Sequence, residues 1–153
     1  MHIIELKERQ DISENIKLSR KYAQLGNFLK ELKKKELPLT VIEAVNNDIE
    51  AINSTPQTEF DLTISVTQKQ RKIIKLVEKE LKIVPINYYR NLWSALGMSV
   101  FGLPIGAALG LSFGNMGLIG IGLPLGMSTG IFVGSKMDKK AFEEGRQLDI
   151  EIK

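Results

Sequence analysis

The stretch that decides the fold reads GLPIGAALGLSFG at residues 102–114 and GLPLGMSTGIFVG at residues 122–134. Both copies follow one pattern, G-L-P-[I/L]-G-x-x-x-G-x-x-x-G, and the second copy begins twenty residues after the first. Residues 91–135, which contain both copies, hold no Asp, Glu, Lys, Arg or His. All 21 basic and 18 acidic residues of the chain therefore lie outside this apolar part.

The uncharged stretch is long enough to form two membrane-spanning helices. A bilayer core about 30 Å thick requires about 20 apolar residues in a helix. Leu92–Phe113 supplies 22 residues and Met116–Ser135 supplies 20, with the turn-forming pair Gly114-Asn115 between them. A connection this short predicts two antiparallel neighbours. A buried soluble core is the alternative, but the rest of a 153-residue chain offers little to cover it.

Glycines recur every four residues in both predicted spans. This spacing places them on one stripe of each helix, where a second helix backbone can approach closely. We therefore predict a helix-packing and oligomer interface made of eight ladder glycines: Gly102, Gly106, Gly110, Gly114, Gly122, Gly126, Gly130 and Gly134. Packing inside a single hairpin is the alternative use of these glycines.

One proline lies in each predicted span. Pro104 and Pro124 lack the backbone N–H that an α-helix needs, so each is predicted to kink its helix. If the turn is centred on Asn115, Gly126 lies opposite Pro104 and Gly106 lies opposite Pro124.

The residues that flank the spans predict how the hairpin sits in a membrane. Aromatic rings favour the membrane interface, and basic residues favour its cytoplasmic side. The turn carries no charge whereas both ends carry basic residues, so we expect both termini to face the cytoplasm from the inner membrane. The predicted interface anchors are Tyr88, Tyr89, Arg90, Trp93, Lys136, Lys139 and Lys140.

The first part of the polar remainder predicts amphipathic helices. Residues 11–37 and 41–52 carry apolar side chains three and four positions apart, with Pro38 between them. We therefore predict that residues 1–57 form a cytoplasmic helical hairpin. Residues 2–6 give a weak strand pattern in addition.

The juxtamembrane part, residues 58–90, predicts a strand followed by a basic helix. Residues 59–67 alternate apolar and polar side chains, which is typical of a half-buried strand. Residues 69–84 form a basic amphipathic pattern that ends before Pro85. The apolar side of this helix can pack on the strand, and its basic side can lie on anionic lipid.

The tail, residues 136–153, predicts a short cytoplasmic helix and a C-terminal strand. Leu148, Ile150 and Ile152 alternate with polar residues. The hairpin returns the chain to its starting side, so this strand is expected to pair with the strand that precedes the first span.

The composition argues against several classes of protein. The chain has no Cys and a single His, so it lacks the residues for thiolate or clustered-His metal sites. It contains no phosphate-binding or hydrolase motif. Basic and acidic residues are intermixed, which is untypical of a nucleic-acid surface. We therefore expect no enzyme activity, no catalytic residue, no metal, no cofactor and no nucleic-acid partner.

Residues 93–147 resemble bacterial glycine-zipper transmembrane hairpin proteins. The resemblance rests on the eight ladder glycines, Pro104, Pro124 and the charged exit DKKAFEEGRQL that begins at Asp138. It covers about a third of the chain, and it implies close membrane packing rather than one activity, because the class includes oligomeric anchors and membrane-permeabilising proteins.

The sequence thus predicts a mainly α membrane protein, with two hypotheses for its function. In the first, glycine-zipper hairpins self-associate into a homo-oligomer that forms a pore or a membrane-perturbing assembly controlled by the cytoplasmic domain. In the second, the hairpin is a membrane anchor, and the polar part docks a protein partner without pore activity. The lack of charged residues in the spans weakens a selective ion channel.

Overall fold

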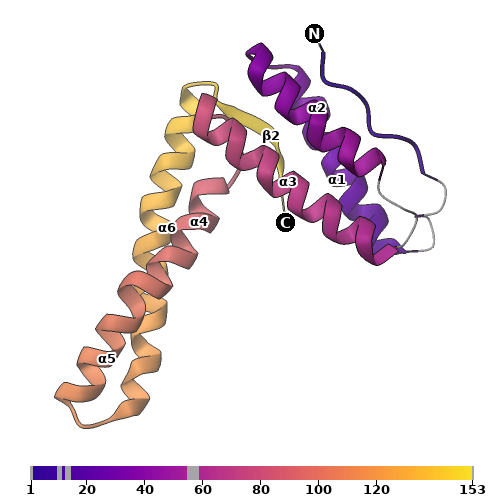
Figure 1. Cartoon of the computed structure of the whole chain (residues 1–153). Coiled ribbons are helices and arrows are strands. Elements are labelled where there is room, and N and C mark those ends of the chain that lie inside the picture. The colour runs from indigo at the N-terminus through magenta and orange to yellow at the C-terminus, as the bar shows by residue number, and fades with distance from the viewer. Residues whose placement is uncertain (1, 10–11, 13–14, 55–58, 153) are drawn as a thin grey trace. The chain divides into compact units, whose positions relative to one another are not determined.

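The computed structural model of the chain describes residues 2–9, 12, 15–54 and 59–152. It is mainly helical and divides into two compact units (Figure 1). The first unit comprises Met1–Val84 with Leu148–Ile150, and the second comprises Pro85–Gln147 with Glu151–Lys153. The predicted first-helix start at Asp11, the predicted hairpin end at residue 57 and the last strand residue Lys153 lie outside the described residues.

The first unit contains three helices, α1 (Ile16–Lys33), α2 (Leu39–Asn53) and α3 (Glu59–Leu81). α1 begins after Asn15, whose side-chain oxygen accepts a hydrogen bond from the Leu18 N–H (3.0 Å) and so satisfies one of the free donors of the first turn. Pro38 separates α1 from α2. The two predicted N-terminal helices are therefore present; α1 is shorter than the predicted range 11–37, and α2 is slightly longer than the predicted range 41–52.

The apolar faces of the three helices form the core of this unit. α3 contacts both α1 and α2, so its apolar side is covered by helices and not by a strand. Its basic side chains at positions 71, 75 and 79 remain exposed. The fully buried side chains include Leu18, Leu25, Phe28 and Leu32 of α1, Val45, Ile49 and Ile52 of α2, and Leu62, Val66, Ile73 and Val77 of α3.

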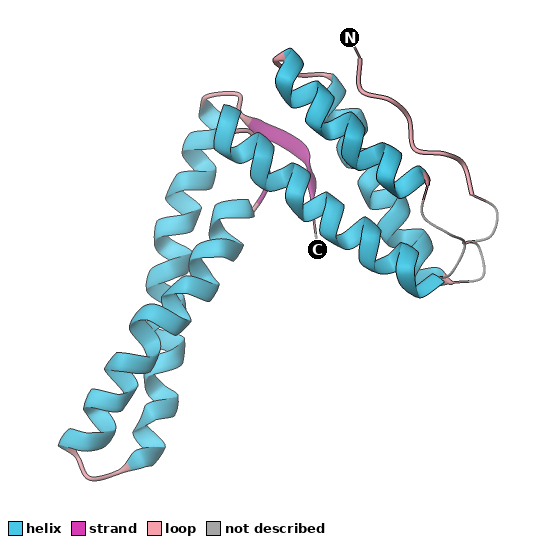
Figure 2. Cartoon of the chain, viewed as in Figure 1, coloured by secondary structure: helices cyan, strands magenta, loops and turns pink. Residues whose placement is uncertain are grey.

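The predicted strand at residues 59–67 is wrong, because this segment is the first part of α3 (Figure 2). Leu62 and Val66 lie four residues apart and are buried, whereas Phe60 and Ile64 lie on an exposed face of the same helix. Two stripes of an amphipathic helix, each with a four-residue spacing, produce the same alternation as a strand over so short a window. Packing against α1 and α2 decides between the two structures.

One acidic side chain is buried between α2 and α3. Asp48 is only 2% exposed, and its Oδ1 accepts hydrogen bonds from the Nζ atoms of Lys69 and Lys72, both at 2.9 Å. Both lysines belong to α3 and keep part of their side chains in water. These ion pairs connect the two helices at the edge of the core.

A small parallel sheet pairs β1 (Val84–Ile86) with β2 (Gln147–Glu151) (Figure 2). The predicted C-terminal strand is therefore confirmed, but its partner is β1 and not residues 59–67. The basic helix ends at Leu81 and not at Val84, since Lys82 has a φ of 56° and the chain then becomes extended. Residues 2–6 belong to no strand.

The second unit is an antiparallel helical hairpin (Figure 1). Its first arm consists of α4 (Tyr88–Leu96), the π-helix η1 (Gly97–Gly102) and α5 (Leu103–Ser112). Its second arm consists of the 3₁₀-helix η2 (Met116–Leu118) and α6 (Ile119–Glu143). Both arms are long and apolar enough to cross a membrane. The predicted pair of apolar helices is therefore present.

The turn and the exit of this hairpin show how each arm ends. Gly114 has a φ of 65°, which a residue with a side chain rarely adopts, and Asn115 Oδ1 accepts the Gly117 N–H at 3.0 Å. The predicted turn at these residues is therefore correct. The separate short helix predicted after Ser135 is wrong, because α6 continues to Glu143 and ends before Gly145, whose φ is 68°.

Candidate functional site: a hairpin packed through glycine

The glycine stripes of the two arms face each other. A Cβ atom added to Gly122 would lie 2.5 Å from Gly106 Cα, and one added to Gly126 would lie 2.6 Å from Gly102 Cα. An ordinary contact of a Cβ atom is 3.4 Å or longer. The two backbones therefore approach more closely than any residue other than glycine permits, and packing of this kind favours helix association where hydrophobic driving force is weak.

The register of the two arms differs from the prediction. Gly126 lies against Gly97 and Gly102 rather than Pro104, and Gly106 lies against Ile119 and Gly122 rather than Pro124. The expected register assumed a chain reversal centred on Asn115. The facing pairs Gly106–Gly122 and Gly102–Gly126 centre on residue 114, because α5 ends at Ser112 and the return arm begins with a 3₁₀ turn, in which each residue advances farther along the axis.

The π-helix η1 explains why Gly97 joins the packing face although it lies five residues before Gly102. A π-helical turn contains one residue more than an α-helical turn, so two residues five apart can share a face. Gly97 is buried, and a Cβ atom added to it would lie 3.0 Å from Gly130 Cα. Pro104 is the second residue of α5, just after η1, and lacks the N–H that would bond the Val100 carbonyl in an α-helix. A π segment thus precedes Pro104, and the kink predicted at this proline stays a prediction.

Pro124 behaves differently, since α6 passes through it without a change of helix type. Nearby hydroxyl groups donate to carbonyls of their own helix, Ser128 Oγ to Pro124 O at 2.7 Å and Thr129 Oγ1 to Gly126 O at 2.8 Å. Such bonds to the preceding turn satisfy hydroxyl groups inside an apolar segment.

The last two ladder glycines pack on predicted interface anchors. A Cβ atom on Gly130 would lie 2.7 Å from the carbonyl carbon of Trp93, and one on Gly134 would lie 2.6 Å from Arg90 Cα. Tyr89 is buried, and its ring packs edge-on against Tyr88, with 5.2 Å between the ring centres. Gly114 is the exception among the eight ladder glycines, because it lies in the turn and no atom would contact its Cβ within 4 Å.

The remaining predicted anchors are on the surface of this unit. Arg90, Lys136, Lys139 and Lys140 are exposed. The Lys136 Nζ lies 4.3 Å from the centre of the Phe132 ring, where the electron-rich face attracts the cation.

Asp138 is a site residue that the sequence analysis missed. Its carboxylate accepts the Tyr89 N–H at Oδ1 (3.0 Å) and the Arg90 N–H at Oδ2 (2.9 Å). These amides belong to the first turn of α4, which has no intrahelical acceptors for them and carries the positive end of the helix dipole. A buried carboxylate from α6 thus caps the first arm.

A signal for this role was present in the sequence. Asp138 lies four residues after Gly134, at the next position of the same stripe, and the buried residues of α6 run through the four glycines to Asp138. In the sequence, Asp138 is the first residue of the charged exit DKKAFEEGRQL. The position of an acid on a glycine stripe was the feature that distinguished it from the exposed charges nearby.

The outer surface of the hairpin is apolar. Only 22% of the most apolar window of the first arm and 17% of that of the second are buried within the structure. A core helix of a water-soluble protein would be mostly buried. Large side chains such as Phe101, Leu111 and Phe132 are more than half exposed, so the hairpin presents apolar side chains outward and glycines inward.

Charged residues gather beyond the end of α6. Arg146 Nε donates to Glu144 Oε2 at 2.7 Å, and Lys140 Nζ lies 3.8 Å from Glu144 Oε1. The hydrogen bond from Arg146, with the positive charges of Arg146 and Lys140, lowers the pKa of the exposed Glu144 carboxyl below its usual value. Within the described ranges, no three His, Asp or Glu side chains gather closely enough to hold a metal ion.

Comparison with known proteins adds no assignment. No protein-family description, characterised protein or solved structure matches this chain.

Proposed function

We propose that this chain is a membrane-anchored docking protein, in which the hairpin holds the three-helix unit at a membrane surface. The proposal rests on one observation: the glycine stripes cover each other, and the outer face of the hairpin is left apolar. A surface of this kind is stable against lipid hydrocarbon and unfavourable in water.

The packing favours an anchor over a pore built from the glycine ladders. Seven of the eight ladder glycines, all except Gly114, are buried inside the hairpin. No ladder is left on the outer face for a second copy to approach. The described spans also place no charged side chain where it could line a channel. Self-association through the glycine-zipper hairpins stays a prediction, as does the resemblance to glycine-zipper hairpin proteins.

The orientation proposed for the anchor has both ends of the hairpin on the cytoplasmic side of the inner membrane. It follows from the basic residues that flank both arms and from the uncharged turn at Gly114 and Asn115. The three-helix unit would then face the cytoplasm, where a protein partner can reach it.

Membrane fractionation tests the anchor. We expect the full-length protein to remain in the membrane pellet after alkaline carbonate washing and to enter the supernatant only with detergent. Recovery in the aqueous supernatant without detergent would refute the proposal.

Cysteine labelling tests the orientation, because the chain contains no Cys and single replacements give unambiguous signals. In intact spheroplasts, a membrane-impermeant maleimide should label Asn115→Cys at the turn and leave Lys139→Cys unlabelled until the cells are lysed. The opposite pattern would reverse the proposed orientation.

Sizing of the purified protein separates the two hypotheses. Light scattering in detergent should give the mass of one chain for an anchor, and a fixed larger mass for a closed assembly. A discrete oligomer that conducts ions in planar bilayers would contradict the anchor and support the pore.

A further inference from the structure

Segment 2–9 lies as an extended chain along α1 and α2 of the first unit, and it belongs to no helix or strand. Four backbone groups of this segment bond to two asparagine side chains of α2. The Ile4 N–H donates to Asn46 Oδ1 (2.9 Å), while Asn46 Nδ2 donates to the His2 carbonyl (3.1 Å). Each asparagine amide holds one donor and one acceptor of the backbone, as its chemistry allows.

Asn53 repeats this arrangement two helical turns later. Its Oδ1 accepts the Lys7 N–H (2.9 Å), and its Nδ2 donates to the Glu5 carbonyl (3.2 Å). Seven residues of an α-helix advance about 10.5 Å, and three residues of an extended chain advance about 9–10 Å. The asparagine spacing on α2 therefore matches a three-residue repeat of the bound segment.

Side chains of the segment follow the same three-residue repeat. Ile3 is 5% exposed, Leu6 lies over Gly26 of α1, and Arg9 reaches the end of α2. The Arg9 Nη2 donates to the carbonyls of Ile52 (3.2 Å) and Asn53 (3.4 Å), which form the negative end of the helix. Recognition of a backbone by amides, with every third side chain in a pocket, is typical of peptide-binding grooves.

Tyr22 of α1 supplies a further backbone contact from the other wall of the groove. Its hydroxyl is part of a largely buried residue and donates to the Lys7 carbonyl at 2.7 Å. Of the hydrogen bonds described here, those from Asn46, Asn53 and Tyr22 go only to main-chain atoms, so they do not depend on which residues occupy the segment.

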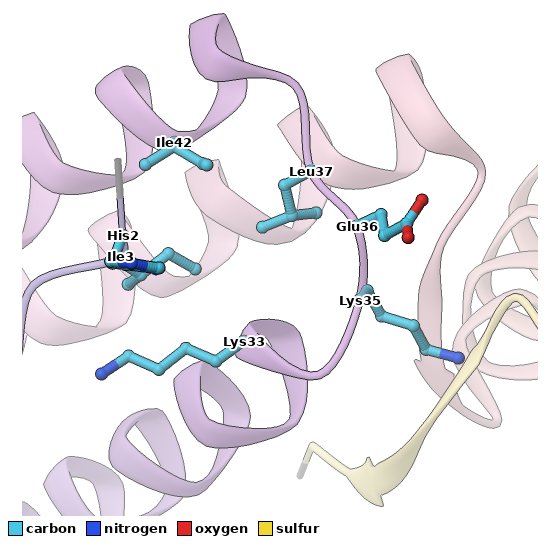
Figure 3. Close-up of a pocket in the computed structure, with 7 residues that line it drawn as sticks. All are labelled: His2, Ile3, Lys33, Lys35, Glu36, Leu37 and Ile42. Carbon is cyan, nitrogen blue, oxygen red and sulfur yellow. The ribbon is translucent and has the colours of Figure 1, made fainter.

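The segment does not fill the groove. A pocket of about 490 Å³ opens beside its first residues, between Lys33 of α1, Leu37 of the connection to α2 and Ile42 in the first turn of α2 (Figure 3). A second pocket of about 310 Å³ lies beside Leu6 and is lined by Leu29 and Lys30 of α1. A longer or bulkier segment could use this space.

We propose that the groove between α1 and α2 is a docking site for an extended segment of a partner protein, and that segment 2–9 occupies it in place of the partner. The partner segment carries an aliphatic side chain, a Leu three residues later and an Arg three residues after that, which is the pattern of Ile3, Leu6 and Arg9. This inference deepens the proposed docking function and rests on it.

The test uses the full-length protein in detergent and a fluorescein-labelled peptide of sequence HIIELKER. Two variants release segment 2–9: Ile3→Asp places a charge at a buried position, and the double variant Ile4→Pro/Lys7→Pro removes the donors to Asn46 and Asn53. Fluorescence anisotropy should show the peptide binding to these variants at least about tenfold more tightly than to the unaltered chain, where the tethered segment competes at a high local concentration.

Further changes in the released background identify the binding groups. Asn46→Ala and Asn53→Ala should each weaken peptide binding about tenfold, since each removes two hydrogen bonds. Asn47→Ala is the matched control, because Asn47 is the exposed neighbour of Asn46 on α2 and should leave binding unchanged. A scrambled peptide, which breaks the three-residue spacing, should bind at least about tenfold more weakly.

Three results would overturn the proposal. In the first, neither release variant retains its helical circular dichroism, so segment 2–9 is an obligatory part of the fold. In the second, the folded variants do not bind the peptide. In the third, the unaltered chain is a dimer that Ile3→Asp dissociates, which assigns the groove to a second copy. Membrane fractionation of the cells that express each variant, before detergent is added, shows independently whether the anchor itself has failed.

Discussion

Exchange of one buried glycine for alanine should loosen the hairpin, and a neighbouring exposed glycine provides the control. In Gly122→Ala, the new methyl carbon would lie 2.5 Å from Gly106 Cα and closer still to the Gly102 carbonyl oxygen, so the arms must separate locally by at least about 0.9 Å to restore a contact of about 3.4 Å. A gap of 0.5–1 Å removes about a quarter to a half of the dispersion attraction between contacting atoms. In Gly120→Ala the methyl group meets no atom within 4 Å.

The two variants differ only in packing, because both replace glycine by alanine in the same helix and gain the same helix propensity, which is up to about 1 kcal/mol. Overpacking of a close contact costs about 1–3 kcal/mol. We therefore expect the unfolding free energy of Gly122→Ala to be lower than that of Gly120→Ala by about 1–3 kcal/mol.

The single tryptophan of the chain makes the assay specific to the hairpin. Trp93 lies in α4 next to Gly130, so its fluorescence reports separation of the arms during titration with SDS in mixed micelles. Linear extrapolation of the transition gives the two free energies. If they agree within about 0.3 kcal/mol, which is the usual error for independent sites, the close approach of the glycines is not what stabilises the hairpin.

Three further changes test other parts of the structure. Asp138→Ala should lower the unfolding free energy by about 1.5–3 kcal/mol in the Trp93 assay, since two charge-assisted bonds to the start of α4 are lost, and Asp138→Asn should have a smaller effect because it keeps one acceptor. Asp48→Ala should lower the unfolding free energy of the three-helix unit, measured by thermal unfolding with circular dichroism, by about 1–3 kcal/mol. The loss should not exceed this range, because the side chain of Lys72 is 65% exposed and its charge stays hydrated when Asp48 is removed. In Arg146→Ala the pKa of Glu144 should rise toward its usual value in an NMR titration. An unchanged Glu144 titration would contradict this role of Arg146. Because the pKa of Glu144 is lowered in the folded chain, its contribution to stability is present above the unfolded pKa and is lost as the pH falls through the folded value.

The sequence predicted the hairpin well because its signals are simple. The length of the uncharged stretch, the turn pair Gly114-Asn115 and the glycine spacing each depend on few residues. The register was not predictable from these signals. It depends on the 3₁₀ turn that begins the return arm and, farther from the turn, on the π-helix before Pro104, which brings Gly97 onto the packing face, and no spacing rule in the sequence indicates either feature.

The errors in the polar part have a different origin. Over residues 59–67 a strand and an amphipathic helix give the same pattern, and only the continuation of the stripe to Ile73 and Val77 favours the helix. The position of segment 2–9 could not be predicted from the sequence, because the hydrogen bonds to Asn46 and Asn53 come from main-chain atoms and do not depend on which side chains the segment carries. Two asparagines seven residues apart do not by themselves indicate that a helix binds an extended segment.

Asp138 also fixes where the apolar part of the hairpin can begin and end. A carboxylate within the hydrocarbon core is costly, so in the proposed membrane anchor Asp138 and the amides of Tyr89 and Arg90 that it binds would lie at the border of the membrane. The glycine stripes would then occupy the interior of the bilayer, where close packing is the available source of helix association. A shift of the arms by four residues would bring glycines of one stripe opposite glycines of the other again, but it would separate the carboxylate from both amides. The polar cap therefore sets the register that the glycines then stabilise.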